Sequence, residues 1–359
     1  MLTQDSKVRV YLYRLFRRSG ARLASGVAGL ALLVTSVSAA AADQDWFFLR
    51  TQNPFLQIYG LPPFQTATLA SEGELQYRAT LDIANHADSG ASQNESIIID
   101  GESYFLTLSA RYGLKEWLEV GFDLPIIWHT RGVFDNAIES WHSFWGISNS
   151  SRTRPSNELL FRYSRQGTTP YELSSPVSGL GDLQLTAAVP LLKKDGSNGH
   201  TVSLRSSLKL PTGDEDDMLG SGATDFSLGL YASKASLFGR PDLAVAGFAG
   251  MLFLGKADVF ADIQESNVTF AGIAAAWQAT DRLSLVAQVY AQDKYLKSEL
   301  NDIGGNTVQA AFGGTYRAPK HGITYSLALV EDLVADTVPD VALHLSVHWH
   351  GGNRKAVSR

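Results

Sequence analysis

From Glu74 onward, apolar and polar residues alternate along the chain in long runs. In the clearest run, 74–83, one face carries only apolar side chains: Leu75, Tyr77, Ala79, Leu81 and Ile83. A period of two is the pattern of a β-strand whose two faces meet different surroundings. Strands of soluble domains usually have ~5–6 residues, whereas a tilted strand needs ~9–11 residues to cross a membrane. The run therefore has the length of a membrane-spanning strand.

The same alternation recurs to the end of the chain. It predicts twelve strands, at 74–83, 104–112, 118–126, 182–191, 202–210, 225–233, 242–254, 267–278, 283–292, 308–317, 323–329 and 340–349. The apolar faces carry no charged residue, while the polar faces carry most of the charges. A soluble β-sandwich would have shorter strands and more lysine on its polar face. The pattern instead predicts an all-β fold: a transmembrane antiparallel up-and-down β-barrel of about twelve strands, spanning 74–350.

The lengths of the connections support this topology. Outer-membrane barrels of bacteria have an even number of strands, short periplasmic turns and longer outer loops. If the first strand starts in the periplasm, nearly all the outer connections are longer than the periplasmic ones. The outer set is 86–101, 129–179, 212–222, 255–266, 294–305 and 333–338, and the periplasmic set is 113–116, 193–199, 234–241, 279–282 and 318–322.

The first 42 residues have the features of a secretory signal peptide. A basic region precedes the apolar run Val27–Val37, and the alanines 40–42 offer a small-residue cleavage site before Asp43. Signal peptides are removed, so residues 1–42 take no part in the fold. The apolar run is too short for a membrane anchor, which needs ~20 residues. The barrel and the signal peptide together place the protein in the bacterial outer membrane.

Composition removes several classes of function. The chain has 359 residues, no cysteine and a formal net charge of −6. Without cysteine there is no disulfide scaffold, thiolate metal site or cysteine nucleophile. Loss of the basic signal peptide makes the mature chain more acidic still, which disfavours nucleic-acid binding. The expected partners are outer-membrane lipid and lipopolysaccharide, the barrel-assembly machinery and a small solute.

Aromatic residues mark the expected membrane boundaries. Amphipathic rings prefer the headgroup level, where they form girdles around a barrel. Four of them lie at the predicted periplasmic strand ends with the parity of the apolar face: Tyr112, Trp277, Tyr316 and Trp349. Trp117 has the opposite parity, so it could instead cap the lumen.

Four segments of the sequence resemble a known family. They are the hairpin 111–125 (RYGLKEWLEVGFDLP) and the segments 179–183 (GLGDL), 209–214 (KLPTGD) and 220–225 (GSGATD). Together they are similar to a family of Gram-negative outer-membrane barrels recorded as a domain of unknown function. That family resembles in pattern the outer-membrane proteins named for the MetA pathway of phenol degradation. The resemblance covers roughly 50–350 and implies the architecture. Unlike many such barrels, the chain continues for a tail, 351–359, after its last aromatic residue.

Charged residues with inward parity predict ion pairs in the lumen, because a charge on the lipid face costs ~2–4 kcal/mol at mid-depth. Asp182, Lys209 and Asp225 lie near the outer ends of three neighbouring strands and are expected to form one cluster. The same reasoning pairs Arg111 with Glu119 across the first periplasmic hairpin. It also pairs Glu74 with His348 where the first strand meets the last.

No catalytic or metal-binding motif stands out. The acidic run 214–217 lacks the spacing of a calcium loop. His344 and His348 lie ~13 Å apart on a strand, and a third ligand for His348 and His350 is not evident. The strand histidines face inward, and no Ser–His pair lies on an apolar face, as an outer-membrane phospholipase would require. We therefore expect no enzymatic activity, no cofactor and no metal.

Two segments outside the strands bear on function. Residues 43–73 are rich in aromatics and proline, and form either a periplasmic tether or a segment inside the lumen. The connection 129–179 has no strand of its own. Rings in it and just before it could line an outer entrance: Trp128, Trp141, His142, Phe144 and Trp145. Eight strands enclose only side chains and sixteen leave a water channel, so either segment could decide whether the lumen is open. The sequence favours a narrow channel or uptake barrel for small solutes, hydrophobic or aromatic ones among them. The alternative is a structural or surface-interaction barrel with a closed lumen.

Overall fold

The computed structural model describes residues 44–134, 157–194, 199–319, 321–333 and 341–351, which all belong to one unit of the chain. The described secondary structure is one sheet of fifteen strands and a single helical turn. Its elements are β1 (Leu75–Ala91), β2 (Glu95–Lys115), β3 (Leu118–Thr130), β4 (Leu160–Arg165), β5 (Thr168–Leu173), β6 (Val177–Leu180), β7 (Gln184–Lys194), β8 (His200–Lys209), β9 (Asp225–Leu237), β10 (Arg240–Phe253), β11 (Asn267–Gln278), β12 (Leu283–Gln292), α3 (Asn301–Gly304), β13 (Thr307–Arg317), β14 (Ile323–Asp332) and β15 (Val341–Gly351).

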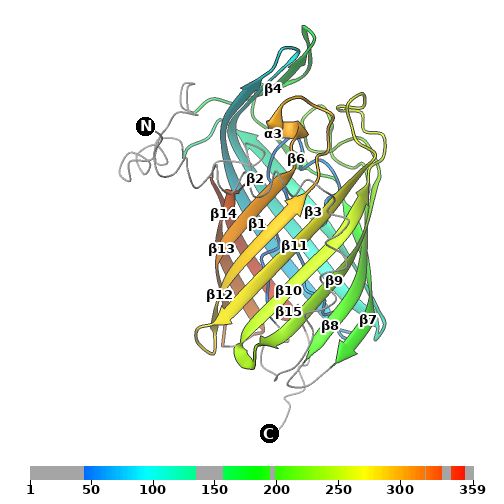
Figure 1. The fold of residues 1–359 in the computed structure, drawn as a ribbon, viewed down its shortest axis with the longest axis vertical. Coiled ribbons are helices and arrows are strands. Elements are labelled where there is room, and N and C mark those ends of the chain that lie inside the picture. Colours follow the sequence, from blue (N-terminus) through cyan, green and yellow to red (C-terminus); the bar gives the residue numbers. More distant parts are fainter. Residues whose placement is uncertain (1–43, 135–156, 195–198, 320, 334–340, 352–359) are drawn as a thin grey trace. The chain divides into compact units, whose positions relative to one another are not determined.

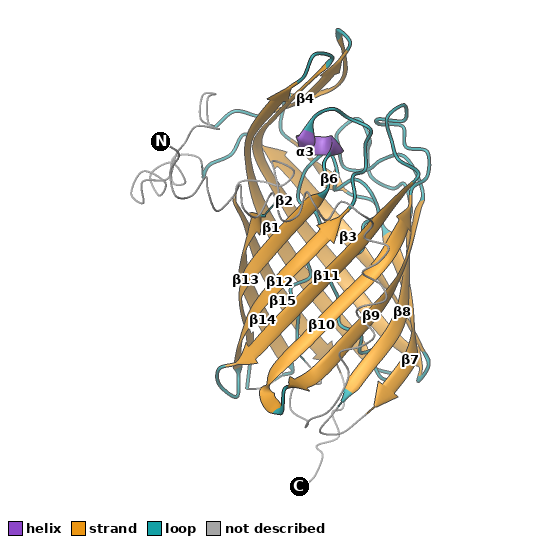
Figure 2. Cartoon of the chain, in the orientation of Figure 1, coloured by secondary structure: helices purple, strands orange, loops and turns teal. Residues whose placement is uncertain are grey.

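Twelve of these strands close into a ring (Figure 1). Successive barrel strands pair antiparallel, with β3 pairing with β7 across the three strands between them. The ring is completed where β1 meets β15, with Leu75 opposite Gly351. The other three strands, β4, β5 and β6, are attached at the outer end (Figure 2). This confirms the predicted twelve-stranded antiparallel barrel.

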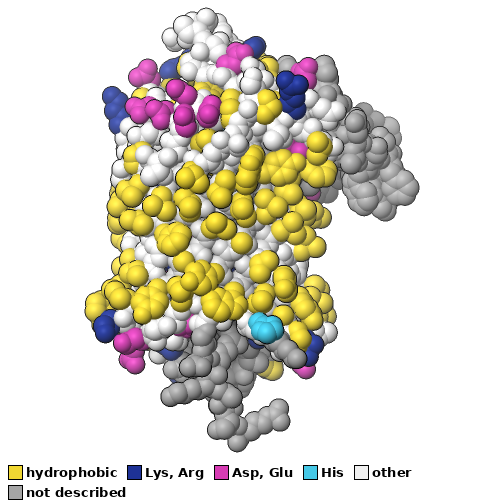
Figure 3. Space-filling model, turned by 180° about the vertical axis from the view of Figure 1, so that it is seen from behind, with side chains coloured by type: hydrophobic (Ala, Val, Ile, Leu, Met, Phe, Trp, Pro, Cys, Tyr) yellow, Lys and Arg dark blue, Asp and Glu magenta, His cyan; other side chains and the backbone are white. Residues whose placement is uncertain are grey.

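The face of the barrel seen in Figure 3 carries a belt of apolar side chains, and most of the charged side chains visible on it lie near its two ends. The belt follows from register: Leu81 lies opposite Leu106 and Leu345, and Leu345 lies opposite Leu327. Exposed leucines in such a continuous belt are unfavourable in water and favourable in lipid. Among the described residues, no helix has the length and apolar character needed to cross a membrane.

Aromatic residues lie on the outside at the end of the barrel that has the tight turns. Tyr112, Trp277, Tyr316 and Trp349 are 38–47% exposed, and the Trp349 ring stacks on Tyr77 at 5.4 Å between centroids. Their role as a membrane girdle remains a prediction. Trp117 lies in the turn between β2 and β3 and is 61% exposed, so it does not cap the lumen.

Two predicted loops are wholly or partly strand. β1 and β2 continue past the barrel wall and turn at 92–94, so the expected loop 86–101 is mostly a hairpin. Ile97 and Ile99 are buried there, because β4 pairs with the extended β2. The connection 129–179 was expected to contain no strand, and that expectation is wrong: it contains β4, β5 and β6. Its residues 135–156 lie outside the described part of the chain.

The main hydrophobic cluster lies inside the barrel and is built around residues 44–71, which we call the lumenal plug. The plug precedes β1 and forms no strand. It fills the lumen with almost completely buried side chains: Phe47, Leu49, Phe55, Leu56, Tyr59, Leu61 and Phe64. The structure therefore places this segment in the lumen, rather than as a periplasmic tether.

The lipid-facing belt can be tested by its depth dependence. Leu327, midway along β14, is 53% exposed, and Leu327→Arg should lower the free energy of unfolding in lipid vesicles by ~2–4 kcal/mol. Phe238, in the turn between β9 and β10, is 82% exposed, and Phe238→Arg should cost only ~0–1 kcal/mol because it lies at the boundary. Chemical denaturation measures both. Equal costs for the two variants would contradict the assignment of a lipid belt.

Candidate functional site: the lumenal plug and its contacts

The plug runs from the periplasmic end of the barrel to the outer end and back. Asp45 contacts the end of β15, and Asn53 donates a hydrogen bond of 2.9 Å from its side-chain amide to the Asp302 carbonyl in the outer connection. The chain turns at 54–58 and descends to Ala70, next to the start of β3. Three groups of charged wall side chains hold this path, besides single hydrogen bonds such as that from Gln288 to the Phe47 carbonyl at 3.0 Å.

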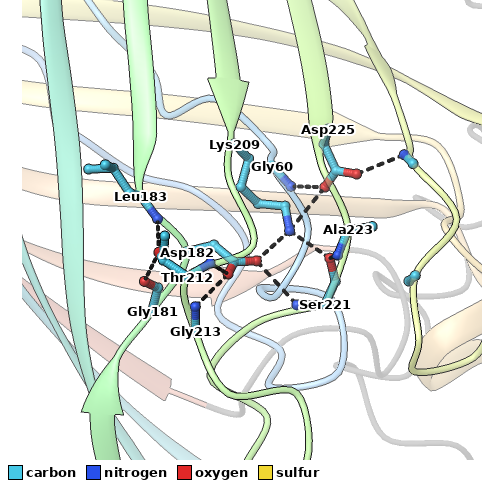
Figure 4. Close-up of polar contacts among 12 residues, drawn as sticks. Gly60, Gly181, Asp182, Leu183, Lys209, Thr212, Gly213, Ser221, Ala223 and Asp225 are labelled. Atoms are coloured by element: carbon cyan, nitrogen blue, oxygen red, sulfur yellow. Dashed lines mark hydrogen bonds and ion pairs between the residues drawn. The ribbon is translucent and has the colours of Figure 1, made fainter.

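The first group lies toward the outer end and contains the predicted cluster (Figure 4). Lys209 lies between two carboxylates: its ammonium contacts Asp182 and lies 3.5 Å from Asp225. Asp225 accepts a 2.9 Å hydrogen bond from the Gly60 backbone N–H. A Cβ on Gly60 would lie 3.0 Å from the Cβ atoms of both Lys209 and Asp225, so glycine lets the plug approach closely, and a larger residue here would require a small shift of these neighbours. We call Asp182, Lys209, Asp225 and Gly60 the outer clasp.

The glycine-containing segments 209–214 and 220–225 position this clasp. Asp182 accepts backbone hydrogen bonds from Thr212, Gly213 and Ser221 at 2.8–3.2 Å, so it ties down the connection between β8 and β9. Lys209 also donates to the Ser221 hydroxyl at 2.6 Å. The loop thus surrounds a buried ammonium with acceptors, which is the condition for burying a charge without a large penalty.

The second group lies toward the periplasmic end, and here the predicted pairing is wrong. Arg111 pairs with Asp123 at 2.8 Å, and Glu119 pairs with Arg205 at 2.7 Å. The reason is side-chain space across the strands. Arg111 lies opposite Gly121 and passes over it to Asp123. Ala188 lies opposite both Glu119 and Arg205, and its small side chain leaves room for that pair.

These side chains also hold the descending part of the plug. Arg205 donates to the Thr66 and Thr68 carbonyls at 3.0 and 3.1 Å. Glu119 accepts from the Ala70 N–H at 2.6 Å. Arg205 and Asp123 were not singled out from the sequence, although their inward parity was visible.

The third group fixes the start of the plug. Asp45 lies 2.6 Å from His348, 3.3 Å from His350 and 3.1 Å from Arg78. The predicted Glu74–His348 pair is absent from these described residues, because Arg78, not Glu74, lies opposite His348. Glu74 instead accepts from the Ser71 N–H and from Gln76. Asp45, Arg78, His348 and His350 form the inner clasp.

The inner clasp contains a set of possible metal ligands. One ligand atom each from Asp45, His348 and His350 lie within 4.8 Å of one another. The Arg78 guanidinium already balances the carboxylate and also lies 2.9 Å from the His348 ring nitrogen. Because a divalent cation would be repelled by that guanidinium, we do not assign a metal here. The expectation of no metal remains a prediction.

Burial and neighbouring charges shift the pKa values of two plug residues, Asp45 and Tyr59. Burial acts to raise the pKa of Asp45, but His348, His350 and Arg78 outweigh it and hold that pKa well below its usual range. Burial and the nearby Asp225 carboxylate raise the pKa of Tyr59, so its hydroxyl stays protonated. At neutral pH the inner clasp is therefore anchored by a charged carboxylate.

The predicted outer entrance is only partly described. Trp128 lies opposite Tyr104 on the outward side of β3, next to the buried His129, so it does not line the lumen. Trp141, His142, Phe144 and Trp145 lie outside the described residues. In the acidic run 214–217, Asp214 accepts backbone hydrogen bonds from Asp216 and Asp217.

A closed antiparallel barrel with an apolar belt defines this protein as a Gram-negative outer-membrane β-barrel, here with a lumenal plug. Residues 27–350 match the model of the family described as "Protein of unknown function (DUF3187)", so the chain belongs to that family. No curated protein matches the sequence.

Several solved outer-membrane barrels are similar in structure. An outer-membrane channel from Pseudomonas putida F1 is 14% identical, with 82% of this chain and 98% of that chain covered and a TM-score of 0.48. The NanC porin is 10% identical, with 77% and 98% covered and a TM-score of 0.42. The toluene transporter TbuX from Ralstonia pickettii is 10% identical, with 79% and 90% covered and a TM-score of 0.36.

Removing the ammonium of the outer clasp should destabilise the barrel. Lys209→Met leaves two buried carboxylates without their cation, and breaking a buried pair in this way costs ~3–5 kcal/mol. The folded band in heat-modified gel mobility should be lost at a lower temperature. As a control, Lys294→Met removes a half-exposed partner of Glu265, which should cost ~1 kcal/mol or less. An unchanged gel transition for Lys209→Met would show that the cluster does not stabilise the fold.

Proposed function

We propose that this protein is an outer-membrane channel for small solutes, seen here in a closed state, and that it opens when the lumenal plug leaves its place. The observation that carries the proposal is the kind of contact between plug and wall. The plug forms no strand with the barrel. Wall side chains hold it through three charged groups and through single hydrogen bonds, such as the one that the Tyr290 hydroxyl donates to the Pro62 carbonyl at 2.7 Å. Such contacts can break one group at a time while the barrel's own hydrogen bonds stay intact.

Polar atoms along the plug support its displacement. Among the described residues, buried side-chain atoms without a hydrogen-bond partner in the protein occur on the plug and on the facing wall: Gln52, Gln57, Gln184, Gln292 and Gln309. These amide groups make the surface between plug and wall partly polar, so water could solvate it when the plug leaves.

The second candidate is a structural barrel whose lumen stays closed. It is favoured by the aromatic packing at mid-plug, where Phe64 meets Phe248 edge to face at 4.9 Å and Phe248 stacks on Tyr231 at 5.0 Å. In either case we propose no enzymatic role. We also propose three kinds of partner: a small solute, the barrel-assembly machinery and lipopolysaccharide.

A disulfide between plug and wall would test the channel. The chain has no cysteine, and a Cβ on Gly60 would lie 3.0 Å from the Asp225 Cβ, close to the ~3.5–4.5 Å of a disulfide. Oxidised Gly60→Cys/Asp225→Cys protein should hold the plug in place. Entry of arabinose into liposomes should fall to the rate of protein-free vesicles and return on reduction.

The two single-cysteine variants are the matched controls, and oxidant should change neither. Equal arabinose entry with the disulfide formed and reduced would show that the plug does not gate the lumen. If folded wild-type and reduced double variant both admit no arabinose, the closed structural barrel is favoured.

A further inference from the structure

An aromatic cage surrounds the tip of the plug. The fully buried Phe55 ring lies 6.4 Å from Phe161 on β4, 5.9 Å from Tyr171 on β5 and 5.7 Å from Phe260 between β10 and β11. We call Phe161, Tyr171 and Phe260 the outer cage. Its three residues come from the outer connections, and only the occupant, Phe55, belongs to the plug. The cage thus lies at the outer end of the barrel, where the plug turns.

The cage is held together without Phe55. Phe260 packs edge to face against Tyr163 at 5.4 Å. Phe161 packs edge to face against the buried His86 and His129 at 5.7 and 5.3 Å. The Tyr171 hydroxyl donates to the Asp216 carbonyl at 3.1 Å. Each wall therefore has its own support, so the cage should keep its shape when the plug tip leaves.

The ring of Phe55 is bound by its aromatic character. Its contacts are tilted or edge to face, with interplanar angles of 53–82°. These geometries match the negative face of one ring with the positive edge of another, which a saturated ring of the same size does not offer. The hydrogen bond at this residue stays within the plug, from the Phe55 N–H to the Asn53 side chain at 2.9 Å. The three cage rings contact the phenyl group of Phe55.

We propose that the outer cage is a binding site for neutral solutes with a single aromatic ring, and that Phe55 occupies it as an internal substitute. A solute that enters from outside competes with Phe55 for the cage and so releases the plug tip. This proposal rests on the proposed function, since it requires a plug that moves. It adds the class of solute and the residues that select it.

The test measures how accessible the plug tip is to a thiol reagent while the three cage residues are unchanged. Leu56 is fully buried next to Phe55, and Leu56→Cys provides the chain's sole thiol. A membrane-impermeant maleimide should label this cysteine faster when phenol is present, because phenol displaces Phe55. Cyclohexanol at the same concentration should act about two- to tenfold more weakly, which is the discrimination that aromatic pairs provide.

Matched variants distinguish binding of phenol in the cage from a general unfolding of the plug by phenol. Phe260→Leu in the Leu56→Cys background should abolish the preference for phenol over cyclohexanol. Ala67→Cys, buried in the descending plug, reports whether phenol merely unfolds the whole segment, and its labelling should not respond before that of Leu56→Cys. Gln57→Cys serves as the reporter if Leu56→Cys does not fold, which heat-modified gel mobility shows.

The outcomes distinguish this inference from the proposed function. Equal acceleration by phenol and cyclohexanol, or an unchanged preference in Phe260→Leu, would overturn the cage while leaving a movable plug. No labelling of Leu56→Cys or Gln57→Cys under any of these conditions would overturn both, because the plug would then not move.

Discussion

A ring of twelve strands is wider than the ring of eight that inward side chains alone can fill, and this width shapes the whole structure. Eight strands make a lumen that side chains close, whereas sixteen leave an aqueous channel. The intermediate size requires a further piece of chain if the lumen is to be closed. Residues 44–71 provide it, and they explain why the segment before β1 is rich in aromatics without any strand periodicity. The apolar core of this protein is accordingly in the lumen, while its other apolar surface faces lipid.

The charged residues on the inner wall of the barrel follow from its position between lipid and lumen. Charged residues are excluded from the lipid face, so they line the lumen, where each buried charge needs a partner. The outer clasp and the Arg205–Glu119 pair meet that need between strands and also bond the plug backbone. The inner clasp meets it with the side chain of Asp45, which belongs to the plug. The plug is therefore held mainly through its main chain, which makes its path depend on a few wall residues, such as Asp225 and Arg205.

Much of this could be predicted from the sequence. Alternation predicted all twelve barrel strands, because lipid and lumen impose opposite chemistry on successive residues. It also brought Asp182, Lys209 and Asp225 together, since parity and strand order fix their positions. The pairs Arg111–Glu119 and Glu74–His348 were wrong, because long side chains reach over Gly121 and Ala188 and because the register of β1 with β15 places Arg78 opposite His348. The plug had no periodic pattern, and its contacts join residues far apart in the chain, such as Asp45 with His348.

The central claim is that the plug alone closes the lumen. Conductance of the refolded protein in a planar bilayer, compared with a variant that lacks 44–71, tests it most directly. We expect steady unitary steps from the deleted variant, and smaller or rarer steps from the complete chain. Heat-modified gel mobility must first show that both are folded. A folded, plug-free barrel without conductance would contradict the account, because the lumen would then be closed by something other than the plug.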